Sequence, residues 1–517
     1  MVETNPISWL LAFTPVMILI LLMTIAKMGG SKAGFATWFT TQVIAFLFFG
    51  TTPEIIGVSM FKALFLALDV TMIIWGAMYL YHITNTSGAI NRIGDFLSAF
   101  TDNKAYLGIF LAWLFPSFLQ GLDGFGVPVA VSAPLMVSAG FSPMLSIVLT
   151  SIGHGWGVSF GSMGASIRTL HAMTGLPVVF FAPKAAILLG LTAIIGGLIV
   201  VYLAGGKEKF FQAIPLTIFI GLVIAIGQYL IAGTEFWMIA VTLPVMISLL
   251  LGFLYVGFFS QQSRAWVYNL NKKEWKRIIE SVIPYTLLVA LIFVFNFFQP
   301  LQDLFQPFNF SIKIPEFQTK LGFSIPAEWT KNINFFLHPG TVLIITGFIS
   351  FFFLQWRGYL IKSQHLQSVK KTIKSSTNAT IAIFTLVGTA VSMRHAGMIA
   401  ILAEGVSKFF PRDLYPIVSP FIGALGAFIT GSNNNSNVLF AELQLQTAQM
   451  LELPIAWILA AQTTGGAMGS IMAPAKVILG CTTVGLNGKE GQVISRLLFI
   501  CAAILLFIGI IVFAVTG

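Results

Sequence analysis

Long apolar runs alternate with short polar segments along almost the whole chain. A helix needs about 20 predominantly apolar residues to cross the hydrocarbon core of a bilayer. Runs of that length, or close to it, lie at 9–27, 33–50, 59–81, 105–119, 128–160, 179–204, 213–231, 236–258, 282–298, 339–356, 378–401, 413–430, 438–480 and 493–515. The pattern predicts an all-α polytopic membrane protein with about 12–14 transmembrane segments.

Two polar, glycine-rich segments interrupt this pattern without forming charged loops. Residues 121–126 read Gly-Leu-Asp-Gly-Phe-Gly, and residues 431–437 read Gly-Ser-Asn-Asn-Asn-Ser-Asn. Polar backbone at membrane depth is tolerated only where protein or a water-filled cavity satisfies it. We therefore expect broken or re-entrant helices at both places.

The surroundings of these two segments are similar. Each is followed by a proline on the next apolar run, Pro143 or Pro454, and then by a second break rich in Gly, Ser and Thr. The second breaks are predicted at 151–157 and 462–466 and continue to Gly161-Ser162 and Gly469-Ser470. The pattern predicts two related units, 105–167 and 413–475, which the chain enters from opposite sides of the membrane. Such units would form an inverted repeat with a substrate site near the midplane.

The alternative is that these small residues only let helices pack closely. Packing glycines do not require an Asp and a run of Asn at membrane depth, so we favour a binding site. The expected organisation is a scaffold at 1–104, a first repeat core at 105–204, central helices at 205–377, a second repeat core at 378–492 and a last helix at 493–517. The broken helices suggest an elevator-like motion of the two cores.

Composition agrees with a lipid-embedded chain. Of the 517 residues 57% are hydrophobic and 9% are charged, far fewer charges than the quarter or so in soluble domains. The formal net charge of +10 comes from Lys and Arg between the apolar runs, with no basic face that would bind nucleic acid. Cys481 and Cys501 lie in apolar runs without metal-like spacing.

Lys and Arg also predict the orientation, because positive loops stay in the cytoplasm. The loops 27–32, 82–104, 204–212, 259–281 and 357–377 carry 16 Lys and Arg, whereas the loops 51–57, 168–184, 230–235, 299–338 and 402–412 carry 7. The bias places the amino terminus outside, and the terminus lacks the basic segment of a cleaved signal peptide. We expect a multi-pass protein of the cell (cytoplasmic) membrane.

The broken helices offer donors for an anion. The amino terminus of a half-helix presents unpaired N–H groups and a positive dipole end. The candidate substrate-binding residues are Gly124, Gly126, Val127, Ser432, Asn433, Asn434, Asn435, Ser436, Asn437, Thr463, Thr464 and Gly465. The Asn side chains can donate to an anion or offer carbonyl oxygens to a sodium ion.

Four ionisable residues, one in the first break and three within the apolar runs, are further candidates. Asp123 could hold and release a proton, or cap the following helix. His154 could relay a proton, or be a neutral hydrogen-bonding residue. Arg394 and Lys476 could bind a substrate carboxylate or pair with Asp123 or Glu442, and Arg394 could instead snorkel to the interface.

The motifs resemble those of the bacterial L-lactate permease family. Residues 118–130 are similar to its glycine-rich motif, and residues 430–437, with Thr463-Thr464-Gly465-Gly466, Pro474 and 484–490, follow its carboxy-terminal pattern. The resemblance implies a proton-coupled carrier of lactate, glycolate and similar 2-hydroxy monocarboxylates.

The sequence departs from the family pattern at several of the candidate positions. It has Gln120 where the family usually has Glu, Asp123 where a small residue is usual and Asn433 where Asp is frequent. Arg394 and Lys476 stand where neutral residues are expected. An added cation and a lost acid would favour an anion held more strongly, or more highly charged, than lactate.

We interpret the sequence as a secondary active transporter that carries L-lactate, or glycolate, by proton symport. The alternatives are a sodium-coupled carrier of another organic or inorganic anion and, from another class, an anion channel. The chain has no HExxH, GxSxG or nucleotide motif, so we do not expect an enzyme or a cofactor. The expected partners are a small organic anion, a proton or sodium ion and membrane lipid, with a homodimer as one option and no nucleic acid.

Overall fold

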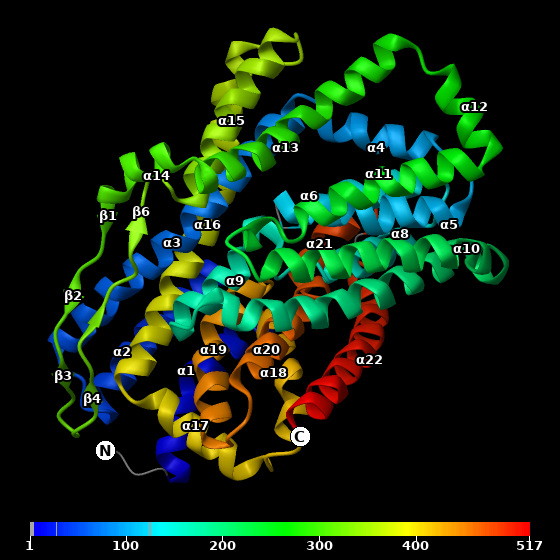
Figure 1. Cartoon of the computed structure of the whole chain (residues 1–517). Coiled ribbons are helices and arrows are strands. Elements are labelled where there is room, and N and C mark those ends of the chain that lie inside the picture. Colours follow the sequence, from blue (N-terminus) through cyan, green and yellow to red (C-terminus); the bar gives the residue numbers. More distant parts are fainter. Residues whose placement is uncertain (1–4, 27, 123, 125, 487) are drawn as a thin grey trace.

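The computed structural model describes residues 5–26, 28–122, 124, 126–486 and 488–517, and most of its regular structure is helical (Figure 1). Among the described residues, nine helices are long and apolar enough to cross a membrane. One of them, α10 (Val178–Ala232), reverses at Gly206, where φ is +68°. Its two arms pack together, with Gly190 against Ala225 and Gly221 against Ile194. The protein is therefore a multi-pass membrane protein with many helices, as predicted.

Most of the remaining helices surround two units of broken helices. Before the first unit lie α1 (Pro6–Thr24), α2 (Gly30–Phe48), α3 (Pro53–Thr86) and the short amphipathic α4 (Ala89–Ala99). Between the units, besides α10, lie η2 (Trp237–Ile239), α11 (Thr242–Phe259), α12 (Gln261–Asn269), α13 (Lys272–Phe297), α14 (Gln299–Phe305), α15 (Pro339–Trp356), α16 (Lys362–His395) and α17 (Met398–Phe409). The chain ends with α22 (Glu490–Thr516).

The two units have the same order of elements: helix, break, helix, turn, helix, break, helix. The first consists of a rod made of α5 (Lys104–Leu107), the π-helical η1 (Gly108–Leu114) and α6 (Phe115–Leu122), followed by α7 (Val127–Ser138), α8 (Pro143–Gly155) and α9 (Gly161–Thr174). The second consists of α18 (Tyr415–Thr430), α19 (Asn433–Met450), α20 (Ile455–Ile471) and α21 (Pro474–Thr483). Pro143 is the first residue of α8, where proline fits well, and Pro454 immediately precedes α20 as its N-cap.

The turns of the two units lie at opposite ends of the molecule. In the first unit, the turn between α7 and α8 lies beside the start of α5, where Lys104 Nζ donates to the Gly140 carbonyl at 3.3 Å. In the second unit, the turn between α19 and α20 lies beside α17, with Ser407 Oγ 3.8 Å from Met450 Sδ. Met450 and Thr319, which is part of the β-ribbon described next, line one cavity. The ribbon lies at the left in Figure 1, whereas α12 and the bend of α10 lie at the right, so the two units run in opposite directions.

The segment predicted as a proline-rich external loop contains a β-ribbon. After α14 and η3 (Gln306–Phe308), three short antiparallel pairs form: β1 (Asn309–Phe310) with β6 (Ile333–Asn334), β2 (Lys313–Ile314) with β5 (Glu328–Trp329), and β3 (Phe317–Gln318) with β4 (Ser324–Ile325). The tip contacts the end of α2, where Lys320 N donates to the Gly50 carbonyl at 2.8 Å. The ribbon therefore covers helix ends on one side of the molecule. The Lys and Arg counts of the loops predict that this side is external.

Three predicted boundaries differ from the structure. The break predicted at 462–466 is wrong: α20 is helical there, and the interruption lies at Met472-Ala473. Its glycines serve close packing, because a Cβ on Gly465 would lie 1.8 Å from the Pro420 carbonyl oxygen of α18. The first unit's second break begins after Gly155, at the end of the predicted range. The basic segment 362–377 is the first part of α16, because a helix can extend past the bilayer into water.

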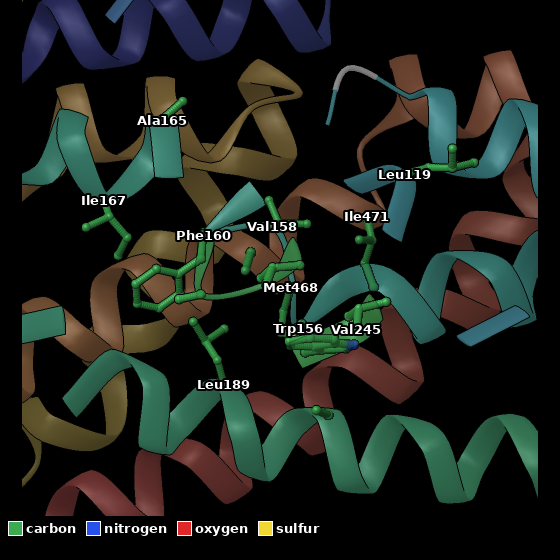
Figure 2. Packing of buried hydrophobic residues seen from close by; sticks show 14 of the residues in the cluster. Leu119, Trp156, Val158, Phe160, Ala165, Ile167, Leu189, Val245, Met468 and Ile471 are labelled. Carbon is green, nitrogen blue, oxygen red and sulfur yellow. The ribbon is translucent and has the colours of Figure 1, made fainter. Parts of the chain in front are cut away.

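The second break of the first unit is anchored by aromatic side chains. Trp156 and Phe160 are fully buried within the break, and Figure 2 shows them among Leu189 of α10, Val245 of α11 and Met468 of α20. Beyond the break, Ser162 and Met163 have φ of +48° and +54°, a conformation that non-glycine residues rarely adopt. Packing from three helices therefore holds the chain in a strained path at this place.

Candidate functional site

Residues in or beside all four breaks line one cavity. It is lined by Gln120, Gly124, Val158, Gly161, Ser162, Ser166, Gly431, Ser432, Asn433, Asn434, Ser470 and Lys476. The first and second breaks of each unit thus meet in one place, as an inverted repeat of broken helices predicts.

The two breaks of the first unit are hydrogen-bonded to each other. Gly124 N donates to Ser162 Oγ at 2.8 Å. The Gln120 amide fills the space beside two glycines, because a Cβ on Gly124 or on Gly161 would lie 2.3 or 2.4 Å from Gln120 Nε2. Both positions therefore need glycine for this approach, and the Gln120 side chain is held against the cavity.

Asparagine side chains at the start of α19 connect the second unit to the first. Asn434 Oδ1 accepts a hydrogen bond of 2.5 Å from Ser166 Oγ of α9. Asn433 Nδ2 donates to Ser159 Oγ and to the Thr463 carbonyl, both at 3.1 Å. These buried bonds join α9, the 156–160 break, α19 and α20 around the cavity.

The start of α19 has no side-chain cap among the described residues. The side chain of Ser432, its N-cap, makes no capping bond to the helix, so the first N–H groups lack the usual side-chain acceptor. Lys476, in the first turn of α21, lies at the same cavity and donates to Ser470 Oγ at 2.5 Å. Among the described lining residues Lys476 alone is charged. The cavity therefore combines helix N–H groups, amides and hydroxyls with one cation, which suits a small anion.

Other predicted residues support the cavity from behind. Thr463 Oγ1 accepts from Asn437 Nδ2 at 3.1 Å, and Ser436 Oγ donates to the Gly423 carbonyl at 2.6 Å. Thr464 is buried, and Gly465 packs against α18. None of these residues is part of the described lining.

Three more predicted residues lie close to the cavity but outside its lining. Gly126 has φ of +99° and caps α7, whose first residue is Val127. Asn435 lines a neighbouring cavity, which shares Gly431, Ser432 and Lys476 with the first. This neighbouring cavity also touches the start of α2 and the middle of α16.

Arg394 and His154 do not line the described cavity. Arg394 is 3.5 Å from Glu328 Oε2 and 3.9 Å from Glu442 Oε1, and it lines a separate cavity beneath the ribbon. His154 is buried in α8, where its Nδ1–H donates to the Thr150 carbonyl at 2.6 Å. Asp123 lies outside the described residues.

Seven lining residues were not among the sequence candidates: Gln120, Val158, Gly161, Ser162, Ser166, Gly431 and Ser470. A signal for four of them was present, because Gly161, Ser162 and Ser470 belong to the predicted continuations of the second breaks and Gly431 to the predicted break at 431–437. Ser166 follows the non-helical residues Ser162, Met163 and Gly164, so helical spacing from Ser162 does not point to it.

A membrane protein whose cavity is formed by the interrupted helices of two inverted units has the architecture of a secondary transporter. The chain belongs to the L-lactate permease family, which matches residues 8–516. This confirms the family predicted from the two motifs.

Named relatives are similar over nearly their whole length. The chain is 25% identical to the L-lactate permease of Bacillus subtilis (strain 168), over 98% of this chain and 95% of the relative. It is 26% identical to the glycolate permease of Escherichia coli (strain K12), over 94% and 91%, and 25% identical to the L-lactate permease of the same strain, over 94% and 92%. Among solved structures, the Alcanivorax borkumensis YdaH transporter is 14% identical with a TM-score of 0.43, over 87% of this chain and 85% of its own.

Proposed function

We propose that this protein is a secondary active transporter of a small 2-hydroxy monocarboxylate, L-lactate or glycolate, with the cavity between the four breaks as its substrate site. The observation that carries the proposal is the composition of that cavity: one lysine, the open start of α19 and a ring of amides and hydroxyls. The names of the family and of its relatives support the substrate class.

The proposed binding mode assigns each part of the substrate to a group in the cavity. The carboxylate accepts from Lys476 Nζ and from the first N–H groups of α19. Gln120 Oε1 is buried and accepts no hydrogen bond from the described residues, so it is free to accept from the 2-hydroxyl group. An acid without the hydroxyl would leave this oxygen unpaired and bind more weakly.

Proton symport is the coupling that the family resemblance implies, and Asp123 is the proposed proton carrier, with His154 as a relay. Asp123 lies in the sequence between Gln120 and Gly124, which both line the cavity, and this supports the proposal. We expect Asp123→Asn to keep substrate exchange between equal pools while losing accumulation driven by a pH gradient. Unchanged accumulation would remove Asp123 from the mechanism.

Sodium coupling is the second candidate, and a specific observation favours it. Asn433 Oδ1 and Asn437 Oδ1 are buried and accept no hydrogen bond from the described residues. Their amides are oriented by main-chain acceptors, since Asn433 Nδ2 donates to the Thr463 carbonyl and Asn437 Nδ2 to the Ser166 carbonyl at 2.9 Å. Such oxygens are suitable ligands for a small cation.

The proposed setting is the cytoplasmic membrane, with the amino terminus and the β-ribbon outside. In this proposal the two broken-helix cores, within 105–204 and 378–492, move against a scaffold formed by 1–104, 205–377 and 493–517. The positive charge of the loops opposite the ribbon supports the orientation.

Uptake of labelled L-lactate into proteoliposomes tests the function. An inward proton gradient without sodium should drive accumulation, and a protonophore should abolish it. Accumulation that instead requires a sodium gradient at equal pH would replace proton coupling by sodium coupling. Failure to bind or exchange L-lactate and glycolate under either gradient would contradict the proposed substrate class.

The substitution Lys476→Met tests the proposed anion site. Loss of a charge-assisted hydrogen bond should raise KM for L-lactate about tenfold or more. Lys207→Met, on the exposed bend of α10, removes the same charge far from the cavity and should leave KM unchanged. Equal KM values for the two variants would show that Lys476 does not bind the carboxylate.

A further inference from the structure

A separate cavity lies between α13 and α15, at the end of the molecule that carries the basic loops. It is lined by Lys272, Trp275, Lys276, Ile279, Glu280 and Ile283 of α13, together with Phe353, Trp356 and Arg357 at the end of α15. None of these residues lines the substrate cavity.

Two lysines of this cavity have no carboxylate partner among the described residues and can contact a ligand. Its one carboxylate, Glu280, is fully used, because Oε1 pairs with Arg357 and Oε2 accepts from the Tyr359 hydroxyl at 2.6 Å. Within the described part of the chain, neither Lys272 nor Lys276 has a carboxylate within 4.0 Å. The mouth of the cavity is therefore positive and suited to an anionic group.

The apolar part of the cavity continues from these lysines along α13. Lys272, Lys276, Ile279 and Ile283 recur at helical spacing and so share one face of α13. Ile279 is 57% exposed, and Trp356, on the facing end of α15, is 76% exposed. The order of groups along the cavity is therefore cationic at Lys272 and Lys276, aromatic at Trp356 and aliphatic at Ile279 and Ile283. This is the order expected from water, through the membrane interface, to the hydrocarbon core.

From this order of groups we propose that the cavity binds a phospholipid with an anionic headgroup. The phosphate accepts from Lys272 and Lys276, and an acyl chain lies along Ile279, Ile283 and Phe353. Anionic lipids of the cytoplasmic leaflet attract basic segments at this level, and burial of a chain in an apolar groove adds to that attraction. A free phosphate could use only the first of these contacts.

Thermal unfolding of the delipidated protein in detergent tests the site. Phosphatidylglycerol should raise the unfolding midpoint by about 2–4 °C at saturation, and phosphatidylcholine should raise it less. The double variant Lys272→Gln/Lys276→Gln should lose the phosphatidylglycerol effect. The matched control Lys370→Gln/Lys371→Gln, which removes the same charge from exposed positions of α16, should keep it.

Several results would overturn the proposal. They are a full phosphatidylglycerol effect in the Lys272/Lys276 double variant, an equal effect of phosphatidylcholine on the wild-type protein, and an equal effect of inorganic phosphate. If the double variant does not fold, native mass spectrometry of the wild-type protein with equimolar lipids decides. Preferential retention of phosphatidylglycerol supports the site, and equal retention of both lipids overturns it.

Discussion

Single glycines determine how closely the helices of the second unit approach each other. A Cβ on Gly423 of α18 would lie 2.0 Å from the Gln462 carbonyl oxygen, and one on Gly466 of α20 would lie 2.0 Å from Asn433 Oδ1. These contacts bring α20 close to α18 and to the asparagines at the start of α19. The small residues of α20 were predicted to form part of a break in the binding site. In the structure they allow close helix packing, which was the alternative interpretation.

The substitution Gly465→Ala tests this close approach. The added methyl group would meet the Pro420 carbonyl oxygen at 1.8 Å, so we expect a loss of about 1–3 kcal/mol in the free energy of unfolding. The control is Gly57→Ala in α3, where the added Cβ would have no neighbour within 4 Å and should stabilise the helix by about 0.5–1 kcal/mol. Equal unfolding midpoints for both variants would argue against a steric contact at Gly465.

At the scale of elements, α3 connects the cavity-bearing helices to the ribbon through two charge clusters. Asp69 is fully buried and accepts two hydrogen bonds of 2.7 Å from Arg168 of α9. Two turns earlier on α3, Lys62 pairs with Glu328 of the ribbon. Any movement of α9 against α3 must break the Asp69–Arg168 pair.

Removing Arg168 should be costly because it leaves Asp69 buried without its main partner. We expect Arg168→Met to lower the free energy of unfolding by about 3–5 kcal/mol. The double variant Asp69→Asn/Arg168→Met should recover much of this loss, since it removes the stranded charge as well. Chemical or thermal denaturation of both variants measures the free energy of unfolding. A double variant that is no more stable than the single variant would contradict the pairing.

The ribbon should dock in a pH-dependent way. Burial raises the pKa of the Glu328 carboxyl, but the hydrogen bond from His395 and the charges of Lys62 and Arg394 outweigh burial and hold the pKa at about 2. A carboxylate with a lowered pKa stabilises the folded state above its ordinary pKa of 4.5, and this stability is lost as the pH falls through about 2.

Comparison of the wild-type protein with Glu328→Gln isolates this contribution. The wild-type unfolding midpoint should exceed that of the variant at about pH 6, and the difference should shrink as the pH falls from about 5 towards 2. A constant difference over that range would mean that the Glu328 charge does not hold the ribbon. Glu316→Gln, on the same ribbon segment but without an ion pair within 4.0 Å in the described residues, should behave like the wild type.

At the scale of the whole molecule, the sequence predicted the spans, the first breaks and the meeting of two units, because these depend on local hydropathy and on the cost of polar backbone in lipid. The pairing of Arg394 with Glu442, 48 positions away, was one of the predicted alternatives, and the two side chains lie 3.9 Å apart. The contact of Arg394 with Glu328, 66 positions away, was not predicted, because only tertiary packing brings the ribbon to α16. The ribbon was also missed, because its strands are two residues long and carry no clear alternation.

The central claim is that substrate occupies the cavity where the four breaks meet. The measurement that tests it most directly is alkylation of Ser432→Cys, in a background with Cys481→Ala and Cys501→Ala, with and without L-lactate. Ser432 lines the cavity, whereas Ser363, on the exposed start of α16, provides the control Ser363→Cys. We predict that L-lactate slows alkylation of Ser432→Cys and leaves that of Ser363→Cys unchanged. Equal alkylation of Ser432→Cys with and without saturating L-lactate would contradict the account.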